Sequence, residues 1–168
     1  AFANKGVYIK PTAIVKILDR NGNVLEDNSS DVQKTQVMSE KTAYEMTSML
    51  EGVIARGTGT AASIGRPAAG KTGTTDDNQY AWFSGYTPDI VTAGWVGDDP
   101  GSQSLGEIYG GTVPAQIWHD YMASAVSGTS ADDFDVPAGM GKAYYEEPKE
   151  AVKSDKKNDK EDKKEESA

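Results

Sequence analysis

Apolar and β-branched residues open the chain in two short stretches. Residues 7–9 and 13–18 are rich in valine and isoleucine, and an Asp-Arg-Asn-Gly-Asn segment at 19–23 separates them from Val24 and Leu25. Asn followed by Gly readily adopts the positive φ angles of a tight turn. The pattern therefore predicts a β-hairpin in this region.

A helix is predicted over residues 40–56. Ser39 is suited to cap its first turn, and Gly57 is expected to end it as a C′ residue. The apolar positions recur at steps of three and four, which places them on one helix face. They are Ala43, Met46, Leu50, Val53 and Ile54.

Two further apolar segments, residues 81–86 and 90–96, flank a Thr-Pro-Asp connection. A link this short joins antiparallel neighbours, so these segments and residues 71–75 are expected to form one sheet. Pro114 suits the first turn of a second helix, predicted over residues 112–126 and packed on that sheet. Its apolar positions are spaced by four and are expected to face the sheet: Val113, Ile117, Tyr121 and Ala125.

The expected fold class is α+β, a partial antiparallel sheet flanked by helices. The end of the chain differs in composition, because residues 142–168 hold eight lysines and nine acidic residues. Such a stretch has too little apolar surface to offset the entropy lost on ordering. We expect a folded domain at residues 1–137, followed by a linker and a disordered Lys/Glu/Asp-rich tail at 138–168.

The formal net charge of −9 argues against several functions. Residues 1–141 hold nine basic and 17 acidic residues, whereas a nucleic-acid-binding surface needs clustered Lys and Arg, so no nucleic-acid partner is expected. Cysteine is absent and His119, the one histidine, is assigned to packing, so no metal site and no cofactor are expected. No apolar run is long enough to span a bilayer, so membrane attachment is expected only through an anchor outside this sequence.

Two motifs overlap at Lys71. Residues 65–72 fit the phosphate-loop pattern G-x-x-x-x-G-K-[ST]. A phosphate loop follows a buried strand and opens a helix, whereas residues 60–64 are not an apolar β run and residues 73–78 are poor helix formers. Nucleotide binding is therefore kept only as a remote alternative.

The second motif is Lys-Thr-Gly-Thr-Thr at 71–75, and K-T-G occurs in serine β-lactamases and penicillin-binding proteins. A cation at Lys71 would attract a carboxylate, and the hydroxyls of Thr72 and Thr74 would hydrogen-bond it. Gly73 leaves room for an extended peptide to lie close to the strand. The backbone N–H of Thr74 is suited to an oxyanion hole.

Several separated segments resemble bifunctional class A penicillin-binding proteins in content and order. They lie at residues 1–8, 10–11, 56–61, 70–75, 81–83, 85–88 and 95–97. The resemblance covers about residues 1–137 and identifies the chain as the C-terminal part of a transpeptidase domain.

The resemblance implies a peptidoglycan D,D-transpeptidase. In that family a serine attacks the penultimate D-alanine carbonyl of a stem peptide, D-alanine leaves, and an amine from another stem resolves the acyl-enzyme. β-Lactams mimic the D-Ala-D-Ala end. The implied residues for binding substrate or β-lactam are Lys71, Thr72, Gly73 and Thr74, and the implied location is the outer face of the bacterial cytoplasmic membrane.

Two motifs of the family, the S-x-x-K nucleophile helix and the S-x-N loop, are missing from residues 1–141. Both precede this region in family order, and the sequence opens without an initiator Met, so we expect a fragment that has no catalytic nucleophile and is inactive alone. The only S-x-x-K begins at Ser154 in the charged tail and is attributed to chance. The alternative is a non-catalytic surface module from a truncated gene, and the genomic sequence upstream of Ala1 distinguishes the two.

The remaining aromatic residues are assigned to the core. Trp82, Trp95 and Trp118 lie on predicted strands and a predicted helix, where packing is commoner than sugar binding. Tyr80 stands where the family usually has an acidic residue, which leaves the contacts just beyond the motif undefined.

Overall fold

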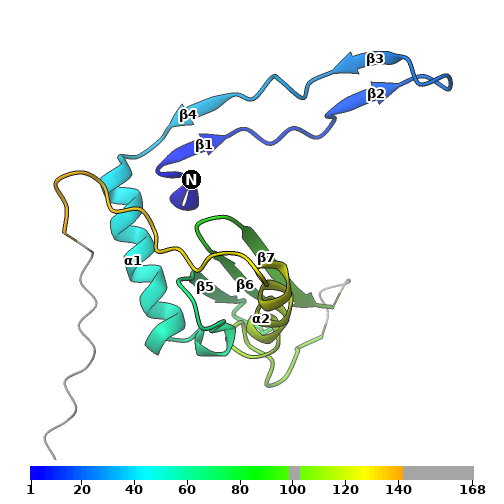
Figure 1. The fold of residues 1–168 in the computed structure, drawn as a ribbon. Coiled ribbons are helices and arrows are strands. Elements are labelled where there is room, and N and C mark those ends of the chain that lie inside the picture. Colours follow the sequence, from blue (N-terminus) through cyan, green and yellow to red (C-terminus); the bar gives the residue numbers. More distant parts are fainter. Residues whose placement is uncertain (99–102, 142–168) are drawn as a thin grey trace, which may run out of the picture.

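The computed structural model describes residues 1–98 and 103–141, and within them the chain has the predicted α+β class (Figure 1). Its helices are α1 (Glu40–Arg56) and α2 (Val113–Ala125), with 3₁₀ turns η1 (Phe2–Asn4) and η2 (Thr60–Ala62). Its strands are β1 (Val7–Ile9), β2 (Lys16–Leu18), β3 (Val24–Asp27), β4 (Lys34–Gln36), β5 (Ala69–Thr74), β6 (Tyr80–Tyr86) and β7 (Val91–Gly97). The charged tail from residue 142 onward, including Ser154, lies outside the described residues.

The predicted hairpin forms part of a long two-stranded arm. β2 pairs with β3 across the turn, and β1 pairs with β4, so the two strand pairs follow one another along a ribbon that projects from the body (Figure 1). The carboxylate of Asp19 closes the turn by accepting the N–H groups of Asn21 and Asn23, each at 2.8 Å. β2 is shorter than the predicted strand, and the pairing of β1 with β4 was not predicted.

β5, β6 and β7 form one antiparallel sheet, as predicted, and the structure gives their order as β5-β6-β7. The turn between β6 and β7 is closed by a backbone hydrogen bond from Thr87 to Ile90 (3.0 Å), and the Thr87 hydroxyl also accepts from the N–H of Asp89. These bonds account for the short Thr-Pro-Asp connection.

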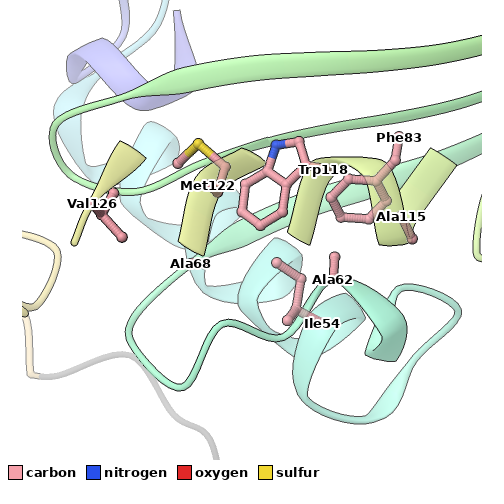
Figure 2. Close-up of a cluster of buried hydrophobic side chains, with 8 residues drawn as sticks. All are labelled: Ile54, Ala62, Ala68, Phe83, Ala115, Trp118, Met122 and Val126. Atoms are coloured by element: carbon pink, nitrogen blue, oxygen red, sulfur yellow. The ribbon is translucent and has the colours of Figure 1, made fainter. Parts of the chain in front are cut away.

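The core lies between this sheet and α2 (Figure 2). Trp118 of α2 is fully buried and meets Phe83 of β6 edge to face, with ring centroids 5.3 Å apart. Its indole N–H donates to the carbonyl of Thr92 at 3.2 Å, which satisfies the one polar group that burial would otherwise leave unpaired. The buried cluster comprises Ile54, Ala62, Ala68, Phe83, Ala115, Trp118, Met122 and Val126.

The predicted helix face of α2 is wrong. Val113, Ile117 and Tyr121 are exposed, whereas the neighbouring stripe that contains Trp118 and Met122 faces the sheet. The sheet supplies the reason: a Cβ on Gly85 would come within 3.0 Å of the Trp118 ring, and one on Gly94 within 3.2 Å of the Pro114 carbonyl. The glycines leave the space that the indole and the first turn of α2 occupy, so they determine which stripe packs inward.

Helix α1 has the predicted bounds and cap. The Ser39 hydroxyl accepts the N–H of Thr42 at 3.0 Å. Gly57 ends the helix, as predicted, but as the C-cap residue rather than C′: its backbone is extended, and its N–H donates to the Val53 carbonyl. Close approach explains this glycine, because a Cβ here would come within 2.9 Å of the Val53 backbone.

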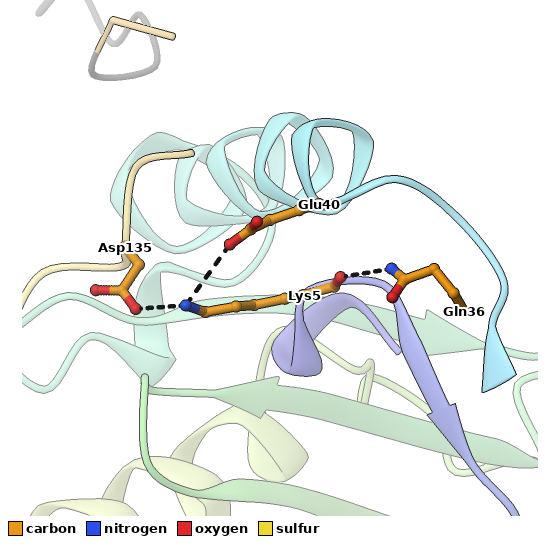
Figure 3. Close-up of polar contacts among 4 residues, drawn as sticks. All are labelled: Lys5, Gln36, Glu40 and Asp135. Carbon is orange, nitrogen blue, oxygen red and sulfur yellow. Dashed lines mark hydrogen bonds and ion pairs between the residues drawn. The ribbon is translucent and has the colours of Figure 1, made fainter. Parts of the chain in front are cut away.

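The segment after α2 returns to the start of the chain (Figure 3). Phe134 packs edge to face on Tyr86, and the Lys5 ammonium lies 2.8 Å from Asp135 and 3.6 Å from Glu40. The hydrogen bond and charge of Lys5 lower the pKa of Asp135, and the same bond raises the pKa of Lys5. Neither helix of the described residues is long and apolar enough to cross a lipid bilayer.

Candidate functional site

The Lys-Thr-Gly-Thr segment lies on β5, one of the two edge strands of the sheet. The N–H of Thr75 donates to Tyr80 of β6 at 3.0 Å. In an antiparallel pair such bonds alternate along the strand, so the backbone groups of Gly73 and Lys71 also face β6. The N–H and C=O groups of Thr72 and Thr74 therefore point to the opposite edge, where an extended peptide can pair with them.

Lys71 shares a sheet face with two indoles. Gly73 is paired with Trp82, and Trp82 with Trp95, and directly opposed residues lie on the same face. The side chain of Lys71, two residues from Gly73, projects to that face as well. This face is the one that α2 does not cover.

Within the described residues, the two indoles on this face lie outside the core. Trp82 is 45% exposed and Trp95 is 43% exposed, and Tyr80 stacks on Trp95 with a centroid separation of 6.0 Å. Of the three tryptophans, only Trp118 lies in the core of the described residues, because the alternation of strand residues places Trp82 and Trp95 on the side of the sheet opposite α2.

The Lys71 ammonium is held along its own strand. It donates to the carbonyl of Thr72 at 2.9 Å and lies 3.4 Å from the Thr72 hydroxyl. Within residues 1–98 and 103–141 no carboxylate forms an ion pair with it. The positive charge therefore stays available to an anionic ligand at this strand.

Both threonine hydroxyls of the motif have a partner from a distant segment. The Thr72 hydroxyl lies 2.8 Å from that of Thr58, which follows α1, and the Thr74 hydroxyl accepts the N–H of Gly110 at 3.1 Å. Thr58 was singled out from the sequence only as part of a matching segment, and Gly110 not at all. The Gly-Gly pair just before the second predicted helix was the available signal.

Close backbone approach fixes the segment before α2 on the motif strand. A Cβ on Gly110 would come within 2.6 Å of the Gly73 carbonyl oxygen and within 2.8 Å of its nitrogen. On Gly73 itself a Cβ would meet only the Trp82 Cβ, at 3.5 Å, because it would project to the opposite face. Gly110 is thus required by packing, and Gly73 keeps one face of β5 clear.

The surroundings of Lys71 differ from those of a phosphate loop. β5 continues through Lys71 and Thr72 to Thr74, where a phosphate loop requires the first turn of a helix. His119 is partly exposed, and its Nδ1 lies 2.8 Å from the Ser63 carbonyl, which fits the packing role assigned to it. In the described part of the chain, no group of three or more His, Cys, Asp or Glu side chains is arranged to hold a metal ion.

Comparison with known proteins gives a consistent result. Residues 1–123 match the family described as "Penicillin binding protein transpeptidase domain". The chain is 44% identical over 138 residues to penicillin-binding protein 1A of Aquifex aeolicus, and 40% identical over 150 residues to that of Clostridium acetobutylicum. These matches cover 81% and 86% of the chain but only 19% and 18% of the relatives, so the chain spans about a fifth of their length.

Solved structures agree with the fold. The crystal structure of penicillin-binding protein 1A from Haemophilus influenzae superposes with a TM-score of 0.68 at 26% identity, over 82% of this chain and 26% of that one. A D,D-transpeptidase domain from Eggerthella lenta gives a TM-score of 0.56 at 30% identity, over 74% of this chain and 29% of that one.

Proposed function

The chain belongs to the penicillin-binding protein transpeptidase domain family, and from that premise we propose that it forms one wall of the substrate cleft of a peptidoglycan D,D-transpeptidase. The proposed ligand is the D-Ala-D-Ala end of a stem peptide, or a β-lactam that mimics it. Lys71, Thr72, Gly73 and Thr74 are the proposed binding residues.

One observation carries this proposal: the edge strand β5 combines open backbone groups with an unneutralised cation. The outward N–H of Thr72 and the outward N–H and C=O of Thr74 suit an extended peptide, whereas the Thr72 C=O already accepts from the Lys71 ammonium. Lys71 and the two hydroxyls suit the terminal carboxylate of that peptide. The N–H of Thr74 also suits the oxyanion formed when a serine attacks the peptide carbonyl. Gly73 adds no side chain between the strand and the ligand.

The other wall of the cleft is proposed to pack on the sheet face that carries Lys71, Trp82 and Trp95. Large apolar side chains exposed together on one face commonly mark an interface. The nucleophilic serine and its lysine partner would come from that wall, as part of the longer protein, and the chain alone would be inactive. We place the domain boundary near residue 137 and the protein on the outer face of the bacterial cytoplasmic membrane.

Acylation of the longer protein by labelled benzylpenicillin tests this function. Wild-type protein is expected to become covalently labelled, and Thr72→Val together with Thr74→Val should slow labelling. Gln116→Ala on the exposed side of α2 serves as a control. Absence of labelling in the wild-type protein, or equal rates in the threonine variants, would show that β5 does not bind the acyl donor.

A further inference from the structure

Thr58 lies outside the motif but is joined to it. Its hydroxyl oxygen is 2.8 Å from that of Thr72, although 14 positions separate them in sequence. Two glycines hold Thr58 in place: a Cβ on Gly59 would come within 2.9 Å of the Phe83 ring, and one on Gly111 would clash with the Thr58 carbonyl oxygen. The loop after α1 is thus packed closely between the core and the segment before α2.

The hydroxyl of Thr72 has a limited capacity for hydrogen bonds. A hydroxyl offers one proton and two acceptor lone pairs. The Lys71 ammonium, 3.4 Å away, is a donor only, so it engages one lone pair. If Thr58 donates to the second lone pair, the proton of Thr72 is the only capacity that remains. If Thr72 donates to Thr58 instead, it has no proton left for a ligand.

A carboxylate accepts hydrogen bonds and cannot donate them. Its arrival next to Thr72 therefore selects the arrangement in which Thr58 donates to Thr72 and Thr72 donates to the carboxylate. Hydrogen bonds that run in one direction along such a chain polarise and strengthen one another. Gly110 acts in the same sense on Thr74, since its backbone N–H is a fixed donor to that hydroxyl at 3.1 Å.

We propose that Thr58 is a positioning residue for ligand binding, which directs the hydroxyl proton of Thr72 towards the carboxylate of a stem peptide or β-lactam. This inference rests on the proposed function of β5. Thr58 acts through Thr72 and does not itself contact the ligand. The hydroxyl of Thr58 orients Thr72 through its hydrogen bond, and the methyl group of Thr58 has no part in this effect.

The test is the second-order rate constant for acylation of the full-length protein by benzylpenicillin and by benzylpenicillin methyl ester. Thr58→Val should lower the rate for the acid about fivefold, as expected for one ordinary hydrogen bond, and leave the rate for the ester nearly unchanged. Thr58→Ser should keep the wild-type rate. The Thr58→Val, Thr72→Val double variant should be no slower than Thr72→Val alone.

Several outcomes would overturn the proposal. Equal losses for acid and ester, or a slow Thr58→Ser variant, would indicate a packing role instead. Multiplying effects in the double variant would mean that Thr58 acts independently of Thr72. Should Thr58→Val fail to fold, Thr58→Ala takes its place as the variant without a hydroxyl and is compared with Thr58→Ser, which keeps one. A wild-type protein that is not acylated by either compound would overturn the proposed function as a whole, whereas wild-type rates in every Thr58 variant would overturn only this inference.

Discussion

The backbone N–H of Gly110 lies 3.1 Å from the hydroxyl oxygen of Thr74, so the segment before α2 is bound to the strand that carries Lys71. This contact couples the position of the motif to the packing of α2 on the sheet. Residues far from Lys71 in sequence therefore help to set the geometry of the proposed cleft wall.

Gly110→Ala should destabilise the protein. The new methyl group would meet the Gly73 backbone, which has no flexible end to move aside, so the segment and β5 must separate. Overpacking of this kind costs about 1–3 kcal/mol. The urea unfolding midpoint should fall, whereas Gly141→Ala, which has no neighbouring atom within 4 Å, should leave it in place. Equal midpoints for the two variants would contradict this account of Gly110.

Gly73→Ala should weaken ligand binding while leaving the stability of this chain nearly unchanged. The added Cβ makes only an ordinary 3.5 Å contact with Trp82, so the free energy of unfolding of this chain alone should change by less than about 0.5 kcal/mol. The methyl group would nevertheless project beside Lys71, between β5 and the proposed second wall of the cleft, and hinder a ligand held there. Acylation of the full-length protein should slow about tenfold or more. Wild-type acylation by this variant would remove Gly73 from the proposed site.

Trp118→Ala and Trp82→Ala offer a matched pair, the same chemical change at a buried and at an exposed position. Trp118 has no exposed surface, and its loss should cost about 3–5 kcal/mol. Trp82 is 45% exposed, and its loss from this chain should cost less than about 1 kcal/mol. In the full-length protein Trp82→Ala should lower the free energy of unfolding clearly more than it does in this chain alone, because the other wall is proposed to pack there. Denaturant unfolding of this chain and of the full-length protein measures both changes. Equal losses of unfolding free energy for Trp82→Ala in the two proteins would argue against that interface.

The stability that the ion pair between Lys5 and Asp135 contributes should be lost at low pH and at high pH. Because the pKa of Asp135 is lowered, its contribution to the free energy of unfolding is present above the ordinary carboxyl pKa and is lost as the pH falls through the lowered value. The raised pKa of Lys5 means that its contribution is present below the ordinary lysine pKa and is lost as the pH rises through the raised value.

Carboxyl ¹³C NMR titration of Asp135 measures this coupling. In Lys5→Met the pKa of Asp135 should return towards its ordinary value, because the ammonium that favours the carboxylate is gone. Lys34→Met, on the arm, is the control and should leave the titration unchanged. An unshifted Asp135 in the wild-type chain would show that the ion pair is not populated in solution.

The sequence predicts the elements of this fold better than their contacts. The bounds of α1 and the membership of three segments in one sheet follow from local signals, namely the Ser39 cap, the spacing of apolar residues and the short Thr-Pro-Asp turn. The face of α2 that packs inward does not follow from local signals, because two adjacent stripes of this helix are both apolar. The space left by Gly85 and Gly94 decides between them, and that information lies on other elements.

The same limit applies to the candidate site. Lys71, Thr72, Gly73 and Thr74 are recognisable because they are contiguous. Thr58 and Gly110 meet the motif through pairings across 14 and 36 positions of sequence, which no local pattern encodes. Trp82 and Trp95 lie outside the core of the described residues, and the sequence could not show this because alternation along a strand fixes two faces without indicating which one is covered.

The most direct measurement is covalent labelling by fluorescent benzylpenicillin, with this chain, the full-length protein and its Lys71→Ala variant compared on one gel. We expect a labelled band for the full-length protein, slower labelling of Lys71→Ala, and no band for the chain alone, because β5 is proposed to bind the ligand and the serine is proposed to lie on the other wall. A covalent band on the isolated chain, or an unchanged rate in Lys71→Ala, would contradict this account.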